Sequence, residues 1–194
     1  ERPSGEGQDW YFMAYGHNYK AALKDFTTFA GKVPLPPRYA FGYWWSRYWS
    51  YSDDELRDLT AKFDAYDIPL DVLVIDMDWH YVNPGRGGWT GYTWNRSLFP
   101  NPAQFLQYLK GKKLQVTLNL HPAGGIEPYE ERYKDMANWM GMDPSSKQRI
   151  DYCGSDKRFM SGWLNTILRP MEKEGVDFWW LDWQQDMFDR HIKT

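Results

Sequence analysis

Residues 70–78, LDVLVIDMD, limit the possible folds of this chain more than any other segment. They form a nearly continuous apolar run that ends in two aspartates, Asp76 and Asp78. Such runs are typical of strands in parallel sheets, because helices cover both faces of these sheets and bury the side chains on each side. The segment therefore predicts a buried parallel strand with carboxylates at its carboxyl end.

Three further segments are predicted to be strands, at residues 39–45, 114–120 and 176–182. Helical patterns lie between them, and another covers residues 18–30. The helix before the last strand is expected to kink at Pro170 and to end at Gly175. Helix-start signals occur at Asn18, at the capping box from Ser52 to Glu55, at Asn101 followed by Pro102, and at Asp156.

This alternation of strands and helices predicts an α/β fold with a parallel sheet and right-handed crossovers. Two architectures have this pattern: a doubly wound sheet and the first half of an eight-stranded barrel. In both, functional residues collect beyond the carboxyl ends of the strands. Those ends carry Asp76, His121 and Asp182, and the loops after the second and third strands are long. We therefore expect the active face on that side of the sheet.

Asp182 lies within the segment GVDFWWLDWQQDMF, residues 175–188, at the end of its apolar run. Because side chains alternate along a strand, Trp180 shares its face and is expected directly beneath it. A carboxylate in an aromatic wall suits a nucleophile that attacks a sugar ring. The alternative is a structural aspartate at the end of a strand that caps the next helix.

Asp76 and Asp78 are expected to share one face of their strand, two residues apart. Their resemblance to a nucleotide-hydrolase strand is not supported, because no phosphate-binding G-x-x-x-x-G-K-[ST] loop is present. A metal site with His80 is a second interpretation. We prefer a third, in which the carboxylates accept hydrogen bonds from vicinal sugar hydroxyls. His121 is predicted to donate to a hydroxyl or to be structural, and residues 85–95 to lay aromatic rings over a ligand or to be a tucked surface loop.

Composition excludes several classes of function. The net charge of -3 gives no electrostatic reason to expect nucleic acid or an anionic membrane as a partner. The one cysteine, Cys153, excludes an intrachain disulfide and a cysteine-based zinc site, and we expect neither a metal nor another cofactor. No apolar run approaches the roughly 18 residues of a membrane span. The aromatic content of 19% suits a surface that binds sugar rings, or simply an aromatic core. The compartment is not fixed by the sequence.

Four segments together resemble glycoside hydrolase family 31, which includes α-glucosidases and α-xylosidases that retain anomeric configuration. They are LPPRYAFGYWWSRYWSYSDDEL, IPLDVLVIDMDWH, WNRSLFPNP and GVDFWWLDWQQ. The resemblance implies a (β/α)8 catalytic barrel of which residues 39–194 are the first half, with residues 1–38 leading into it. The remainder of the parent chain would then be a partner of this segment.

The resemblance also implies roles for individual residues. Asp182 matches the family's nucleophile, Trp180 the tryptophan before it, and Asp76 the aspartate that binds the sugar in the -1 subsite. Trp183, Gln184 and Gln185 depart from the family's Met-Asn-Glu, which bears on substrate identity. The acid/base aspartate lies on a later strand of the family's barrel, so we expect it outside this chain. The implied substrate is an oligosaccharide or other α-glycoside, and the isolated segment is expected to be inactive.

Two alternatives remain open at this stage. A chitinase-like barrel carries Asp-x-Asp-x-Glu on its fourth strand, which DMDWH imitates except that His80 replaces the glutamate. The other alternative is a non-catalytic, carbohydrate-binding partial barrel that uses its aromatic side chains alone.

Overall fold

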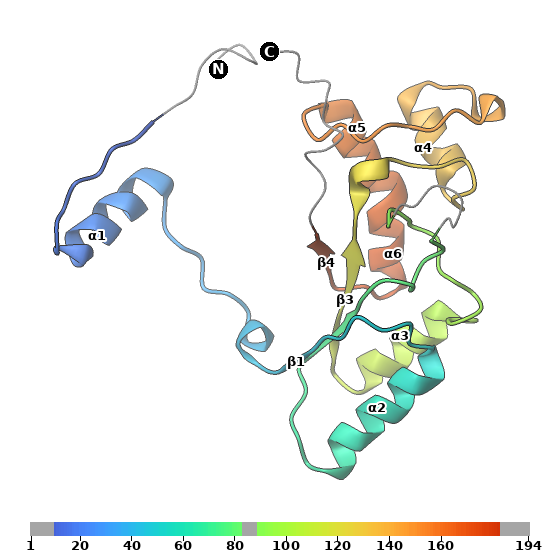
Figure 1. Cartoon of the computed structure of the whole chain (residues 1–194), viewed down its shortest axis with the longest axis horizontal. Coiled ribbons are helices and arrows are strands. Elements are labelled where there is room, and N and C mark those ends of the chain that lie inside the picture. The colour runs from blue at the N-terminus through green and yellow to red at the C-terminus, as the bar shows by residue number, and fades with distance from the viewer. Residues whose placement is uncertain (1–9, 83–88, 183–194) are drawn as a thin grey trace.

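The computed structural model describes residues 10–82 and 89–182, and its centre is a parallel sheet of four strands (Figure 1). The strands are β1 (Trp44–Trp45), β2 (Val72–Ile75), β3 (Gln115–Leu120) and β4 (Phe178–Leu181). Each strand pairs with the next one in the chain, in the order β1-β2-β3-β4. A doubly wound sheet reverses its strand order at a switch point, whereas a barrel does not. The described strands therefore form a partial (β/α)8 barrel.

The α-helices are α1 (Tyr19–Ala30), α2 (Asp53–Ala65), α3 (Pro102–Gly111), α4 (Tyr133–Met140), α5 (Lys157–Gly162) and α6 (Arg169–Glu174). Short 3-10 turns are η1 (Arg38–Phe41), η2 (Pro122–Gly124) and η3 (Pro144–Ser146), and η4 (Trp163–Leu168) is π-helical. The predicted helix starts are confirmed, because the side chains of Asn18, Ser52, Asn101 and Asp156 each accept a hydrogen bond from the first turn that follows.

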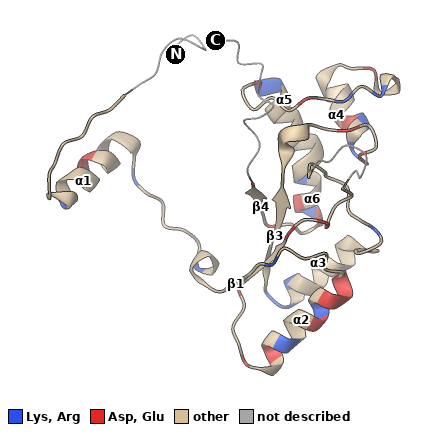
Figure 2. Ribbon diagram, in the orientation of Figure 1, with Lys and Arg blue, Asp and Glu red and all other residues tan. Residues whose placement is uncertain are grey.

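The helices after β1 cover one side of the sheet (Figure 1). The core lies between these helices and one face of the strands, where Leu73, Val116, Leu118, Phe105 and Ile167 are completely or almost completely buried. Charged residues gather on the helices and loops, and the ribbons of β3 and β4 carry none (Figure 2). Helix α1 lies apart from this body and contains no buried residue. No helix among the described residues is both long and apolar enough to cross a membrane.

The predicted first strand, 39–45, is much shorter than expected. Residues 38–41 form the turn η1 instead, and the amide of Tyr43 donates to the carboxylate of Asp71 at 3.1 Å rather than to a neighbouring strand. Gly42 packs so closely against Asp71 that a Cβ there would overlap its carboxylate. The backbone carbonyl of Tyr43 still accepts from the amide of Val72 at 3.1 Å, and the pairing of residues begins at Trp44.

Two helical regions differ in detail from the predicted pattern. At Pro170 the helix does not end: its hydrogen bonding changes to the π-helical turn η4 just before α6, where Pro170 lies in the first turn and its missing N–H is tolerated, and the kink stays a prediction. Helix α4 was not predicted within the long connection after β3. Its N-cap residue, Arg132, makes no capping hydrogen bond with its side chain, so the usual sequence signal for a helix start is absent.

Candidate active site

The register of the sheet brings the predicted site residues together. Val74 pairs with Thr117, and Asn119 pairs with Trp180. When both ladders are continued past the ends of the strands, Asp76 comes beside Asn119 and His121 comes beside Asp182. The amide of Asp182 still donates to the carbonyl of Leu120 at 2.9 Å, which extends the last ladder by one residue.

Asp76 lies one residue beyond β2 and is buried, with 9% of its surface exposed. Its Oδ1 accepts a hydrogen bond from the amide of Met77 at 2.8 Å and from the side-chain nitrogen of Asn119 at 2.6 Å. Both donors stabilise the ionised carboxylate in a place that solvent hardly reaches.

Asp182 is more accessible than Asp76, with 25% of its side chain exposed. Its Oδ2 lies 3.3 Å from the side-chain nitrogen of Asn119 and 3.4 Å from Nε2 of His121. A carboxylate that is held by donors on one side and open to solvent on the other suits a nucleophile.

The side chain of His121 is almost completely buried, and the ring of Trp89 meets it edge to face at 5.1 Å between centroids. Burial lowers the pKa of His121, and the nearby carboxylates of Asp182 and Asp76 only partly offset this effect. The imidazole is therefore neutral at physiological pH, and it can donate or accept a hydrogen bond without carrying charge.

Trp180 lies on the same face of β4 as Asp182 and is 37% exposed. It lines a cavity of about 390 Å³ on the inner face of the sheet, together with Trp44 and Phe178. The predicted aromatic surface beneath Asp182 is therefore present, and its rings belong to the first and last described strands.

The expectation that Asp78 shares a face with Asp76 is wrong. Strand β2 ends at Ile75, and Asp78 lies in the turn that follows, where it has a left-handed φ of 69°. Its Oδ2 accepts a short hydrogen bond from Ser50 at 2.5 Å, so Asp78 joins this turn to the loop after β1. Within the described ranges, no group of three potential ligands is arranged to hold a metal ion.

Residues 89–95 are packed into the protein, in contrast to the expected ligand-covering loop. Tyr92 and Trp94 are buried, the ring of Trp89 contacts His121, and the hydroxyl of Thr90 donates a hydrogen bond to the backbone carbonyl of His121. Gly91 lies against the ring of His80, so closely that a Cβ would overlap it. The tucked-loop alternative therefore holds for this part, while residues 85–88 lie outside the described residues.

Two buried polar residues of this region were not predicted from the sequence. Asn119 is 2% exposed and contacts both Asp76 and Asp182. Glu130 is 4% exposed and accepts hydrogen bonds from the amide of Tyr92 at 3.1 Å and the hydroxyl of Thr93 at 2.5 Å. The only available signal for Asn119 was a polar residue within the apolar run LQVTLNL. Trp183, Gln184 and Gln185, which were expected to affect substrate choice, lie outside the described residues.

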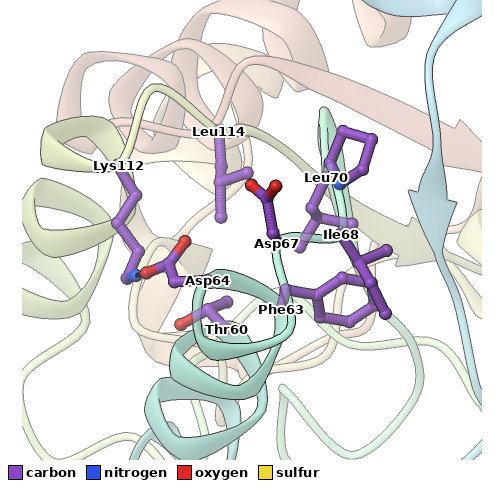
Figure 3. Close-up of a pocket in the computed structure, with 9 residues that line it drawn as sticks. Thr60, Phe63, Asp64, Asp67, Ile68, Leu70, Lys112 and Leu114 are labelled. Atoms are coloured by element: carbon purple, nitrogen blue, oxygen red, sulfur yellow. Dashed lines mark hydrogen bonds and ion pairs between the residues drawn. The ribbon is translucent and has the colours of Figure 1, made fainter.

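A cavity of about 530 Å³ lies at the opposite end of the sheet (Figure 3). Thr60 and Asp64 come from α2, Asp67 precedes β2, and Lys112 precedes β3, so the cavity is at the amino ends of the strands. Lys112 forms an ion pair with Asp64 across it. Since the amino-terminal face of such barrels serves stability, we assign no catalytic role to this cavity.

The sequence comparison decides the family of this chain. Residues 33–192 match the family model described as the glycosyl hydrolases family 31 TIM-barrel domain. The chain belongs to glycoside hydrolase family 31.

Curated proteins of known name agree with this family 31 assignment. An α-glucosidase 2 of Bacillus thermoamyloliquefaciens is 35% identical over 131 residues, which are 68% of this chain and 16% of that protein. An α-xylosidase of Saccharolobus solfataricus is 31% identical over 126 residues, or 65% of this chain and 16% of that protein. The chain thus spans about one sixth of the length of either relative.

Solved structures show the same family 31 fold. A family 31 α-xylosidase from Xanthomonas citri superposes with a TM-score of 0.65 at 20% identity, over 86% of this chain and 19% of that one. A family 31 dextranase from Flavobacterium johnsoniae gives a TM-score of 0.63 at 19% identity, over 87% of this chain and 21% of that one. The superposed part of this chain therefore has the same fold as part of each of these two structures. The chitinase-like alternative is not supported, because DMDWH follows the second strand and not the fourth.

Proposed function

We propose that this chain supplies the nucleophilic half of a retaining α-glycoside hydrolase. The observation that carries the proposal is the cluster of Asp76, Asn119, His121 and Asp182 at the carboxyl ends of β2, β3 and β4. Names of relatives within the family, α-glucosidase and α-xylosidase, support an α-glycoside or oligosaccharide as the substrate.

In this proposal Asp182 attacks the anomeric carbon. A bond forms between its carboxylate oxygen and that carbon, and the bond to the leaving oxygen breaks. A second carboxyl group protonates the leaving oxygen, then removes a proton from the water that releases the sugar from Asp182. Retaining enzymes hold the two carboxyls about 5–5.5 Å apart. We assign this second carboxyl to a part of the barrel outside the present chain.

The other residues bind the substrate. Asp76 has a second oxygen, Oδ2, that makes no hydrogen bond with described residues, and it is free to accept from sugar hydroxyls. Trp180 offers its exposed face to the sugar ring, and His121 supports the carboxylate of Asp182. Asp78 is omitted, because its carboxylate is engaged by Ser50.

The proposal is tested by Asp182→Asn in the complete barrel, by which we mean a chain in which this segment is joined to the remaining strands of its family 31 barrel. Asparagine has nearly the same shape but cannot serve as the nucleophile, so turnover of an aryl α-glycoside should fall by at least about 10⁴-fold while substrate still binds. The non-catalytic alternative predicts no turnover in the unchanged protein and the same binding in both.

The 194-residue chain alone is expected to show negligible turnover of the same aryl α-glycoside. It presents the proposed nucleophile without the second carboxyl, and general acid catalysis typically contributes 10²–10⁴-fold. Clean turnover by the isolated chain would show that the acid has been assigned to the wrong part of the protein.

A further inference from the structure

Asn119 connects the two carboxylates of the cluster. Its side-chain nitrogen lies 2.6 Å from Oδ1 of Asp76 and 3.3 Å from Oδ2 of Asp182. An ionised carboxylate can only accept hydrogen bonds, whereas the amide nitrogen carries two hydrogens. One hydrogen is therefore available for each carboxylate, and the opposite orientation of the amide would turn its oxygen toward two negative charges.

The position of Asn119 is fixed by its surroundings. Asn119 belongs to β3 and is 2% exposed. Its backbone carbonyl accepts a hydrogen bond at 2.8 Å from the indole nitrogen of the fully buried Trp79. The amide therefore has little freedom to move away from the carboxylates, and it acts as a rigid spacer between two strands.

An asparagine is also energetically unfavourable at this buried position of the sheet. The side-chain oxygen Oδ1 of Asn119 is buried without a hydrogen-bond partner among the described residues, and an unpaired buried carbonyl group destabilises a fold. An apolar residue of similar shape would avoid that penalty, as Leu118 and Leu120 do on either side. The retained amide thus indicates a role beyond packing.

We propose that Asn119 is a positioning residue, which donates one amide hydrogen to Asp76 and the other to Asp182 and so fixes the nucleophile relative to the sugar-binding carboxylate. This inference rests on the proposed function of Asp182. Without the amide, two negative charges would face each other, and the carboxylate of Asp182 could turn away from the line of attack. A nucleophile displaced by about 1 Å is expected to lose about 100-fold in rate.

The first test compares Asn119→Leu with Thr117→Val in the complete barrel. Thr117 is buried on the same face of the same strand, two residues earlier, and its hydroxyl has no described hydrogen-bond partner. Both variants replace a buried polar group by an apolar one of similar shape. We expect kcat to fall about 100-fold in N119L, with a smaller change in KM, and to stay within about twofold of the parent in T117V. Equal kcat values for N119L and T117V would overturn the proposal.

The second test uses Asn119→Asp, which preserves the shape of the side chain. At neutral pH the new carboxylate has no hydrogen to donate and adds a third negative charge. Once protonated, it can donate one hydrogen bond, so the ratio of kcat/KM in N119D to that in the parent should rise about tenfold or more as the pH falls from about 7 to about 5. A ratio that does not change with pH, including one that stays at zero, contradicts the positioning role.

Asp182→Asn separates this inference from the proposed function. Full turnover in D182N would refute the nucleophile and the positioning role together. Loss of turnover in D182N with unchanged kcat in N119L would refute only the role of Asn119. A crystal structure of N119L provides a readout independent of turnover, because we expect the carboxylates of Asp76 and Asp182 to lie farther apart than in the parent.

Discussion

Nε2 of His121 lies 3.4 Å from Oδ2 of Asp182, and the imidazole is almost completely buried. Burial lowers the pKa of His121, so this contact joins a carboxylate to a neutral ring at physiological pH. The neutral ring can orient the carboxylate of Asp182 through a hydrogen on Nε2. A charged imidazolium would form a full ion pair with the carboxylate, and such a pair would reduce its nucleophilicity.

His121→Leu in the complete barrel should therefore lower kcat about tenfold or more, because Asp182 loses the imidazole that lies beside its carboxylate. His121→Gln retains an N–H donor and should keep more activity than H121L. Steady-state kinetics on an aryl α-glycoside measure both effects. If the two variants lost the same activity, the ring would contribute packing alone.

Asp76→Ala is expected to affect the binding of substrate and transition state together. A site built to accept hydrogen bonds from sugar hydroxyls loses about 100-fold or more in kcat/KM when the acceptor is removed, because the hydroxyls are then left unpaired. Substrates that lack the contacted hydroxyl should lose less. A series of deoxy-glycosides therefore identifies which hydroxyl Asp76 binds, and an equal loss for every member of the series would indicate a structural role instead.

Residues of the candidate site could be predicted from the sequence only where they come directly after a strand. Asp76, His121 and Asp182 each come directly after an apolar strand, and parallel strands bring their carboxyl ends to one edge. The position of Asp78 in a turn could not be predicted, because the apolar pattern of the sequence gives no sign that β2 ends at Ile75. Asn119 was missed for a different reason. Its importance depends on the register between β2, β3 and β4, which the sequence of one strand does not contain.

The fold was predictable to a similar extent. Local signals, such as the capping residues Ser52 and Asp156, located helix starts correctly because each bond lies within one turn. The first strand was overestimated because the carboxylate of Asp71, remote in sequence, takes up the amide of Tyr43. Tertiary contacts of this kind override local propensity.

The capping box of α2 should contribute measurable stability. The hydroxyl of Ser52 accepts from the amide of Glu55 at 3.2 Å, and the carboxylate of Glu55 accepts from the amide of Ser52 at 2.8 Å. Ser52→Ala is expected to lower the free energy of unfolding by about 1 kcal/mol. The matched control is Ser97→Ala, an exposed serine whose hydroxyl makes no hydrogen bond with described residues. Urea unfolding of the complete barrel measures both, and equal midpoints for S52A and S97A would contradict the prediction.

Gly91 should tolerate no side chain. A Cβ at this position would overlap the ring of His80, which is fully buried and cannot move into solvent. Gly91→Ala is therefore expected to lower the free energy of unfolding by about 1–3 kcal/mol, the usual penalty for overpacking a core. Gly111→Ala is the control, because no atom lies near its Cβ position. A G91A midpoint equal to that of G111A would show that His80 is free to adjust.

Glu130 should make stability depend on pH in an unusual direction. It is buried against Tyr92 and Thr93, and burial raises its pKa from 4.5 to about 7 although both neighbours donate hydrogen bonds to it. Between about pH 4.5 and about pH 7 the unfolded chain has lost this proton, while the folded chain still holds it. The contribution of Glu130 to the free energy of unfolding is therefore greatest below about pH 4.5. It falls by about 3 kcal/mol in total as the pH rises through that interval.

Glu130→Gln removes the titration and keeps the shape of the side chain. The stability of E130Q relative to the parent should therefore rise across the same interval and become constant above about pH 8, as measured by urea unfolding at a series of pH values. Glu131→Gln is the control, because the neighbouring Glu131 has 52% of its side chain exposed and pairs with Arg96 at the surface. Its stability difference from the parent should change little with pH. Parallel pH dependence in E130Q and the parent would show that Glu130 is ionised in the folded protein throughout.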